Sequence, residues 1–126
     1  MAVLIPEHCE LCPRRCGADR RTQTGRCGAG NTLRAARAAL HRWEEPPISG
    51  TRGSGTIFFS GCSLGCVFCQ NRQISRRAAS GTTVSIAELA KTFLSLQNKG
   101  AHNINLVTGA HYAPQVIEAL AQARLL

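Results

Sequence analysis

Residues 55–71 read GTIFFSGCSLGCVFCQN, and this stretch decides how the fold is interpreted. The apolar run TIFFS at 56–60 is bounded by glycines and rich in β-branched and aromatic residues, which predicts a strand buried on both faces. Three cysteines follow within eight residues, at Cys62, Cys66 and Cys69. The sequence therefore predicts a loop with three thiols at the carboxyl end of a strand, where α/β sheets usually bind ligands.

The C-x3-C-x2-C spacing of these cysteines favours an iron–sulfur cluster over structural zinc. Structural zinc normally takes four ligands, whereas a 4Fe–4S cluster can take three thiolates and leave one iron open to substrate. Gly61 and Gly65 let the backbone wrap tightly. Leu64, Val67 and Phe68 offer an apolar shell that limits solvent access. A zinc loop or a set of buried thiols is the alternative interpretation.

Downstream of this loop the sequence predicts a helix, a strand and a second helix. SIAELAKTFLSLQNKG at 85–100 begins with Ser85 and Glu88 in capping-box spacing and ends at a glycine. NINLVTG at 103–109 is typical of a strand, and APQVIEALAQARLL at 113–126 has proline in its first turn. Two βα units in series imply a parallel sheet with right-handed crossovers. We therefore expect an α/β fold that forms the start of a partial (β/α) TIM-like barrel.

The expected domain organisation is a cysteine-rich module with a linker at 1–50, followed by the first, incomplete βα units of the barrel at 51–126. Residues 1–31 show no helical or strand periodicity. The composition of NTLRAARAALHRWE at 31–44 favours a helix, although a strand is also compatible. The prolines and glycines of EPPISGTRGSG at 45–55 indicate the linker.

The N-terminal module carries a second set of thiols, which consists of Cys9, Cys12, Cys16 and Cys27. Four soft ligands suit tetrahedral zinc or an auxiliary iron–sulfur cluster, and a segment with so little apolar sequence needs such a site in order to fold. Four unligated thiols are the alternative, because the interval before Cys27 is longer than in a paired zinc knuckle.

Length and composition exclude several classes of protein. The chain has 126 residues, enough for one modest core, and its 44% hydrophobic content argues against disorder. Its apolar runs are too short to span a bilayer, and the N-terminal sequence MAVLIPEHC lacks the features of a secretion signal. We therefore expect a soluble, cytoplasmic protein with no membrane partner. In that compartment the seven cysteines serve metal or redox chemistry better than disulfides.

The formal net charge of +8 comes mostly from arginines located before residue 80. These arginines include Arg14, Arg15, Arg20, Arg21, Arg72, Arg76 and Arg77. This charge is compatible with an anionic partner such as a nucleic acid, and equally with a solvated basic face.

Three segments carry a resemblance to a known family. HCELCPRRCGADR at 8–20, GSGTIFFSGCSLGCVFCQN at 53–71 and NINLVTGAHY at 103–112 are similar to the pyruvate formate-lyase activating enzyme-like proteins of the radical S-adenosylmethionine (radical SAM) superfamily. The resemblance covers nearly the whole chain, which we expect to be an N-terminal fragment. It is specific for the superfamily and does not identify the substrate.

The resemblance implies an oxidoreductase whose cofactors are a 4Fe–4S cluster and S-adenosylmethionine (SAM). The cluster ligands would be Cys62, Cys66 and Cys69. The fourth iron would bind the amino and carboxylate groups of SAM, Phe68 would lie against the adenine, and Thr108 and Gly109 would contact SAM through their backbone. One electron from the reduced cluster would cleave SAM to methionine and a 5′-deoxyadenosyl radical. The implied partners are an external one-electron donor and a protein or peptide substrate that receives a glycyl radical.

Two positions depart from the family pattern. Gln70 stands where the activating enzymes often carry histidine, and VTGAH at 107–111 replaces a Gly-Gly-Glu-like segment. His111 follows the second strand and would face the same end of the sheet as the cysteine loop, although a lone histidine is more often simply packed. Because about two βα units are predicted, against the eight of a complete TIM barrel, we expect the isolated chain to turn over poorly.

Two other functions compete with this interpretation. The first is a zinc-dependent module that binds RNA or DNA through the N-terminal cysteines and the arginines. The second is a radical SAM enzyme that modifies a nucleic acid. The sequence offers few aromatic residues for base stacking, so the zinc-dependent module ranks below the activating-enzyme interpretation. The arginines do not decide between a nucleic acid and a peptide as the substrate of a radical SAM enzyme.

Overall fold

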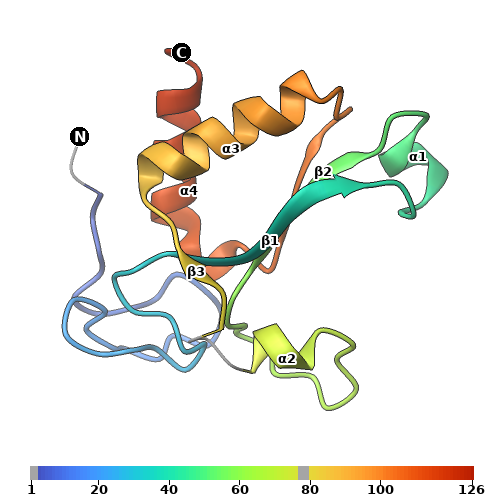
Figure 1. Ribbon diagram of the computed structural model, residues 1–126. Helices are drawn as coiled ribbons and strands as arrows, with labels where there is room; N and C mark the ends of the chain where they lie inside the picture. The colour runs from blue at the N-terminus through green and yellow to red at the C-terminus, as the bar shows by residue number, and fades with distance from the viewer. Residues whose placement is uncertain (1–2, 77–79) are drawn as a thin grey trace.

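A four-stranded sheet with two helices on one face forms the centre of the computed structural model, which describes residues 3–76 and 80–126 (Figure 1). Arg77 lies outside the described residues. The strands are β1 (Arg34–His41), β2 (Ser54–Phe59), β3 (Thr82–Thr83) and β4 (Ile104–Val107). The helices are α1 (Pro46–Ser49), α2 (Arg72–Ser75), α3 (Ile86–Asn98), the 3-10 turn η1 (Ala110–Tyr112) and α4 (Ala113–Ala123). Residues 3–33 form loops beside one end of the sheet (Figure 1).

The sheet is mixed, with the strand order β3-β1-β2-β4. β2 and β4 are parallel, from the pair Gly55 and Ile104 to the pair Phe58 and Val107, and α3 lies between them in the chain. β1 is antiparallel both to β2 and to β3. The predicted start of a TIM-like barrel is therefore wrong, because such a barrel contains parallel strands alone and an antiparallel strand here occupies the other side of β2.

β1 resolves the segment whose structure the sequence left open. Its sequence RAARAALH contains good helix formers, yet it pairs with β2 along its length, with a register shift between Ala35 and Arg37. Long-range pairing outweighs intrinsic propensity here, because propensity differences are small for each residue. The boundary expected between residues 50 and 51 lies in the connection between β1 and β2, which also contains α1.

The N-terminus of α3 confirms the predicted capping box. The Ser85 hydroxyl oxygen accepts the Glu88 backbone N–H at 3.2 Å, and the Glu88 carboxylate accepts the Ser85 backbone N–H at 2.7 Å. α3 has 13 residues and places Leu89, Phe93 and Leu96 in the core. In the described part of the chain, no helix is both long enough and apolar enough to cross a bilayer.

α4 forms where the sequence predicts it, but it turns a different face to the core. The helical periodicity of the sequence groups Val116 with Ile117, Leu120 and Ala121, whereas the structure buries Val116 with Ala119. Ile117 and Leu120 are 67% and 42% exposed. Periodicity alone cannot choose between adjacent apolar residues, and the small Ala119 suits a helix that packs closely against α3.

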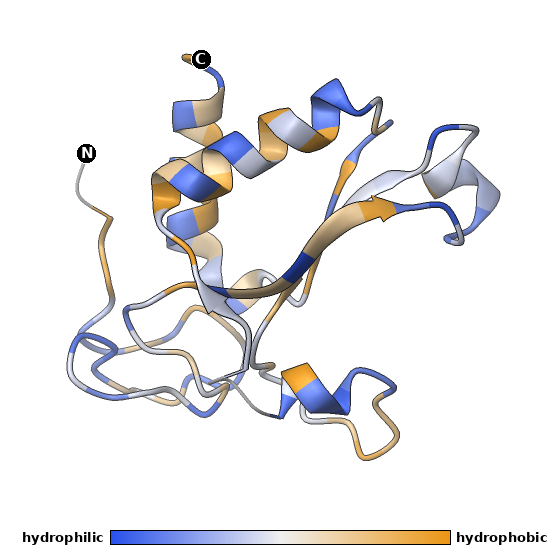
Figure 2. Cartoon of the chain, in the orientation of Figure 1, coloured by the Kyte–Doolittle hydropathy of each residue, from blue (hydrophilic) through white to orange (hydrophobic). Residues whose placement is uncertain are grey.

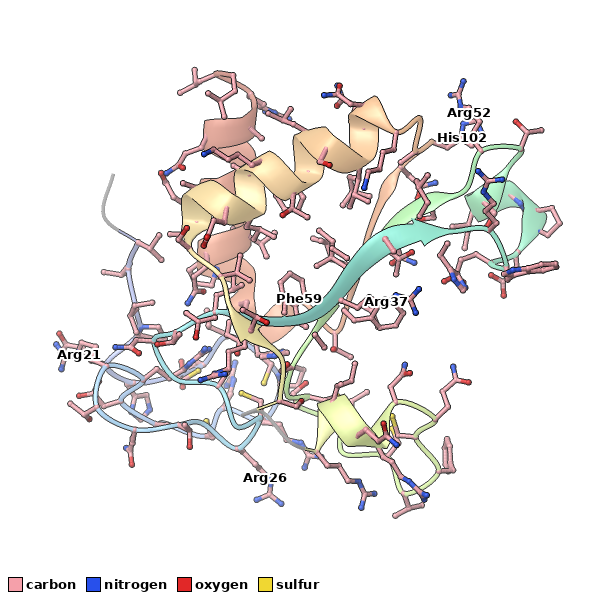
Figure 3. The ribbon with its side chains drawn as sticks, viewed as in Figure 1. Arg21, Arg26, Arg37, Arg52, Phe59 and His102 are labelled. Atoms are coloured by element: carbon pink, nitrogen blue, oxygen red, sulfur yellow. The ribbon has the colours of Figure 1, made fainter. Side chains whose placement is uncertain are left out.

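The core lies between the sheet and the two long helices. Phe59 of β2 projects into this space (Figure 3), and Ile57 beside it is also fully buried. Hydrophobic segments of α3, α4 and the strands meet there (Figure 2). This arrangement confirms that β2 is a buried strand, and it fixes the position of the cysteine loop that follows it.

Candidate metal centre

The cysteine loop connects β2 with α2 and lies at the edge of the molecule (Figure 1). Cys62, Cys66 and Cys69 are free thiols, and each is partly exposed. They therefore lie at the carboxyl end of β2, as the sequence predicts.

Two glycines allow the backbone of this loop to turn sharply. Gly61 and Gly65 have φ values of 82° and 69°, in the left-handed region that favours glycine. A Cβ atom on Gly65 would have no neighbour within 4 Å, so the loop is open at its middle. The Cys69 backbone N–H donates to the Cys66 carbonyl at 3.3 Å, which closes a turn between the last two cysteines.

A hydrogen bond to sulfur favours the thiolate form of Cys69. The pKa of Cys69 is lowered, first because the Ser75 hydroxyl donates to its sulfur at 3.4 Å, and also because of the Asn71 backbone N–H and the positive charge of Arg76. The Leu64 backbone N–H approaches the sulfur of Cys62 at 3.4 Å. Thiolates are the form that binds metal ions, so the surroundings of Cys69 suit a ligand.

The predicted apolar shell of the loop is exposed to solvent. Leu64, Val67 and Phe68 are 67%, 84% and 87% exposed, and Figure 2 shows a hydrophobic stretch on this loop. Phe68, the residue that the resemblance places against adenine, directly precedes Cys69. Its ring is thus accessible to a ligand beside the thiols.

Thr108 and Gly109 follow β4, whose parallel pairing with β2 brings them to the same edge of the sheet as the cysteine loop. Thr108 has a φ of 53°, which is uncommon for a residue other than glycine. A Cβ atom on Gly109 would lie 3.3 Å from the ring of Phe59, so the backbone passes close to the core there. The backbone groups of both residues therefore lie at the sheet edge where the family resemblance implies that SAM would bind.

His111 joins these two neighbouring segments. Its side chain is 3% exposed, and its Nε2 atom lies 2.9 Å from the Ser60 carbonyl oxygen. Burial lowers the pKa of the His111 imidazole, which keeps the ring neutral. The expected position at the cysteine-loop end of the sheet is therefore confirmed, and the packed interpretation of the side chain holds.

The four N-terminal thiols line a single small cavity. Its walls include Cys9, Cys12, Cys16 and Cys27. The sulfur atoms of Cys16 and Cys27 lie 3.4 and 3.5 Å from the position that a Cβ atom on Gly25 would occupy. The free volume of about 10 Å³ is close to that needed for one water molecule or ion.

The N-terminal thiols differ in their surroundings. Backbone N–H groups of Ala18 and Arg26 lower the pKa of Cys16, whereas burial raises the pKa of Cys27. The side chain of Arg26 itself points away from the molecule (Figure 3). Within residues 3–76 and 80–126, no three His, Cys, Asp or Glu side chains are yet gathered closely enough to hold a metal ion. For either set of thiols to hold a metal ion, its sulfur atoms would have to move closer together.

The two sets of thiols are adjacent in space. The Cys62 backbone N–H donates to the Cys27 carbonyl at 3.2 Å. The guanidinium of Arg14 donates to the carbonyls of Ser63 and Leu64 at 2.8 and 2.9 Å. Sequence reasoning missed this connection, because no pattern distinguishes Arg14 from the other arginines of the chain.

Several of the arginines are engaged within the molecule. Besides Arg14, Arg76 donates to the Cys66 carbonyl at 2.9 Å, and Arg21 pairs with two nearby carboxylates. Arg20 is 1% exposed. Many of the positive charges that suggested an anionic partner therefore hold the N-terminal loops and the cysteine loop in place.

Comparison with known proteins identifies no family for this chain. No protein-family model matches the chain, and no solved structure matches it. A curated uncharacterized protein of Methanocaldococcus jannaschii is 39% identical over 76 residues, which cover 60% of this chain and 21% of that protein. The chain thus spans about a fifth of the length of this relative.

Proposed function

We propose that this chain is the cluster-binding part of a radical SAM oxidoreductase, in which Cys62, Cys66 and Cys69 hold a 4Fe–4S cluster. The observation that carries the proposal is the set of three partly exposed thiols on an open loop at the carboxyl end of β2. The residues fit the group, since three thiols share the loop and the Cys69 pKa is lowered. The proposal depends on this loop and not on a barrel.

The residues of the chain have distinct roles in this proposal. When bound, the reduced cluster and SAM supply a one-electron cleavage that yields methionine and a 5′-deoxyadenosyl radical. Phe68 offers its exposed ring to the adenine. Thr108 and Gly109 offer backbone groups at the neighbouring strand end. The Ser75 hydroxyl donates to the sulfur of Cys69 and favours its thiolate form.

The implied partners belong to the complete protein, because the curated relative is much longer than this chain. We propose a protein or peptide substrate that receives a glycyl radical, and an external one-electron donor. We also propose a cytoplasmic location, where thiols remain reduced and free to bind iron.

Anaerobic reconstitution with iron and sulfide tests the proposal. We expect bound iron and sulfide, and an electron paramagnetic resonance signal of the reduced protein that changes on addition of SAM. A variant with serine at Cys62, Cys66 and Cys69 should lose this signal. A Cys12→Ser variant, which alters only the N-terminal set, should keep it. A protein that takes up no iron, or a signal that survives in the triple variant, would refute the proposal.

The nucleic-acid-binding alternative has less support. Arg14, Arg20, Arg21 and Arg76 bond to groups within the chain, which leaves fewer cations for phosphates. A steep fall of RNA affinity with rising salt, in a protein that binds zinc and no iron, would favour that alternative instead.

A further inference from the structure

Arg20 is a buried cation without a carboxylate partner among the described residues. Its Nε and Nη2 atoms donate to the Gly30 carbonyl at 3.2 and 2.7 Å, and its Nη1 atom donates to the His111 carbonyl. The guanidinium carbon also lies 5.8 Å from the centre of the Tyr112 ring. Each nitrogen of the Arg20 guanidinium thus has an acceptor, but these neutral groups do not neutralise its charge.

A buried charge without a counter-charge is unfavourable, so a nearby anion is expected. Arg20 lines the same cavity as the four N-terminal thiols. Bound to zinc, four thiolates carry more negative charge than the ion neutralises, so the site as a whole is an anion. The thiols that surround this cavity can therefore supply the charge that Arg20 lacks.

We propose that Cys9, Cys12, Cys16 and Cys27 bind one zinc ion as a tetrathiolate site whose negative charge Arg20 neutralises. Each thiol loses its proton to solvent as its sulfur binds the ion. Hydrogen-bond donors already surround three of these sulfur atoms. The Ala29 backbone N–H approaches the sulfur of Cys27 at 3.5 Å. The backbone N–H groups of Ala18 and Arg26 donate to the sulfur of Cys16, which also forms a hydrogen bond with the Cys9 side chain. Such donors stabilise metal-bound thiolates.

The donor set favours a single zinc ion, because four thiols from one module line one cavity and supply a complete set of four soft ligands. Zinc prefers four soft ligands in a tetrahedron and needs no open position when its role is structural. The inference does not depend on the chemistry of the triplet at Cys62, Cys66 and Cys69.

The test uses the full chain, purified without added iron and titrated with zinc or cobalt. We expect one equivalent of zinc, and a cobalt spectrum with thiolate charge-transfer bands. Mass spectrometry after alkylation should show the four N-terminal thiols protected by zinc while the triplet still reacts. The variant with serine at Cys62, Cys66 and Cys69 should keep its zinc. Loss of zinc in that variant, or alkylation of the N-terminal thiols at the same rate with and without zinc, would overturn the proposal.

Substitution of Arg20 tests the charge argument. Arg20→Met should weaken zinc binding by about 10- to 100-fold, as is typical when a group supporting metal ligands is removed. Arg21→Met removes the same charge from a neighbouring exposed side chain that points outward (Figure 3), and it should leave the affinity unchanged. Arg20→Lys keeps the charge and should bind zinc more tightly than Arg20→Met, which guards against a variant that folds poorly. Equal affinities for Arg20→Met and Arg21→Met would refute the role of Arg20.

These outcomes are separate from those of the proposed function. Failure of the triplet to take up iron leaves the zinc stoichiometry and the alkylation pattern untouched. If the N-terminal thiols fail to bind zinc, the iron-dependent signal of Cys62, Cys66 and Cys69 still tests the proposed function independently. Uptake of iron in place of zinc by the N-terminal thiols would overturn the zinc proposal alone.

Discussion

Replacing Arg14 with alanine should loosen the attachment of the cysteine loop to the N-terminal loops. The Arg14 guanidinium makes two charge-assisted hydrogen bonds, from Nε to the Ser63 carbonyl at 2.8 Å and from Nη2 to the Leu64 carbonyl at 2.9 Å. Both bonds join segments about fifty residues apart in the chain, so nothing local replaces them. The predicted effect is therefore on the opening of the loop and not on global unfolding.

The size of this effect follows from the two bonds. Both are exposed, so each should contribute about 0.5–1 kcal/mol, the lower part of the range for protein hydrogen bonds. Together they contribute about 1–2 kcal/mol to the closed state of the loop. A change of that size raises the equilibrium constant for opening by roughly 5- to 30-fold.

Hydrogen exchange of the Cys62 amide measures this opening, because that N–H donates to the Cys27 carbonyl at 3.2 Å across the same contact. Arg15→Ala is the matched control: it removes the same charge from the next residue, whose side chain forms no hydrogen bond within the described residues. Two results would refute the proposed role of Arg14 in holding the loop closed. Either the Cys62 amide exchanges equally fast in the Arg14→Ala variant and the unaltered protein, or Arg15→Ala accelerates its exchange as much as Arg14→Ala does.

Three further perturbations test the core, a thiol and a buried histidine. Gly55→Ala should lower the free energy of unfolding by about 1–3 kcal/mol in urea titrations, because the new Cβ would lie 2.8 Å from Cδ1 of Ile104. Adding Ile104→Val removes that Cδ1 atom and should recover part of the lost stability. Ser75→Ala should raise the pKa of Cys69, so the pH profile of Cys69 alkylation in metal-free protein moves to higher pH. The pKa of His111 is lowered in the folded protein, so the unfolded chain binds more protons than the folded chain as the pH falls below the reference value of 6.5. The free energy of unfolding therefore decreases as the pH drops through that value. His111→Gln should flatten this pH dependence in denaturant titrations.

Each of these outcomes can fail in a distinct way. A double variant no more stable than Gly55→Ala would remove Ile104 as the cause of the strain. An unchanged alkylation profile after Ser75→Ala would show that Ser75 does not tune the thiol. The carboxylates of Asp19 and Glu88 also have lowered pKa values, and their contributions are lost at lower pH than that of the histidine. A His111→Gln variant that keeps the loss of stability near pH 6.5 would therefore refute the assignment.

Local signals in the sequence were sufficient for part of the fold. The capping box of Ser85 and Glu88 and the apolar run of β2 each depend on residues close in the chain, and both are confirmed. The sequence left β1 open between a helix and a strand, because β1 is a strand only by virtue of its partner β2, and no local pattern in RAARAALH reveals that partner. The barrel prediction failed for the same reason: two βα units do not indicate which strand pairs with the free side of β2.

The candidate site shows the same division between local and long-range information. The spacing of Cys62, Cys66 and Cys69 places them on one loop, and this follows from the sequence directly. The roles of Arg14 and Arg20 do not, since in a chain of net charge +8 any arginine resembles a solvated surface residue. Only the folded structure shows that one of them bridges two segments and that the other is buried.

Cys27 links the two sets of thiols physically. Its sulfur lies in the N-terminal cavity, and its carbonyl accepts the N–H of Cys62, the first cysteine of the loop. A metal ion that fixes the sulfur of Cys27 also restricts the backbone to which Cys62 is bonded. Thermodynamic linkage makes this effect reciprocal. If metal binding in the N-terminal cavity stabilises the ordered cysteine loop by a given free energy, then ordering of the loop strengthens metal binding in that cavity by the same free energy. A metal ion in the N-terminal cavity would therefore influence the order of the cysteine loop through the backbone of Cys27, without contributing a ligand to the proposed cluster.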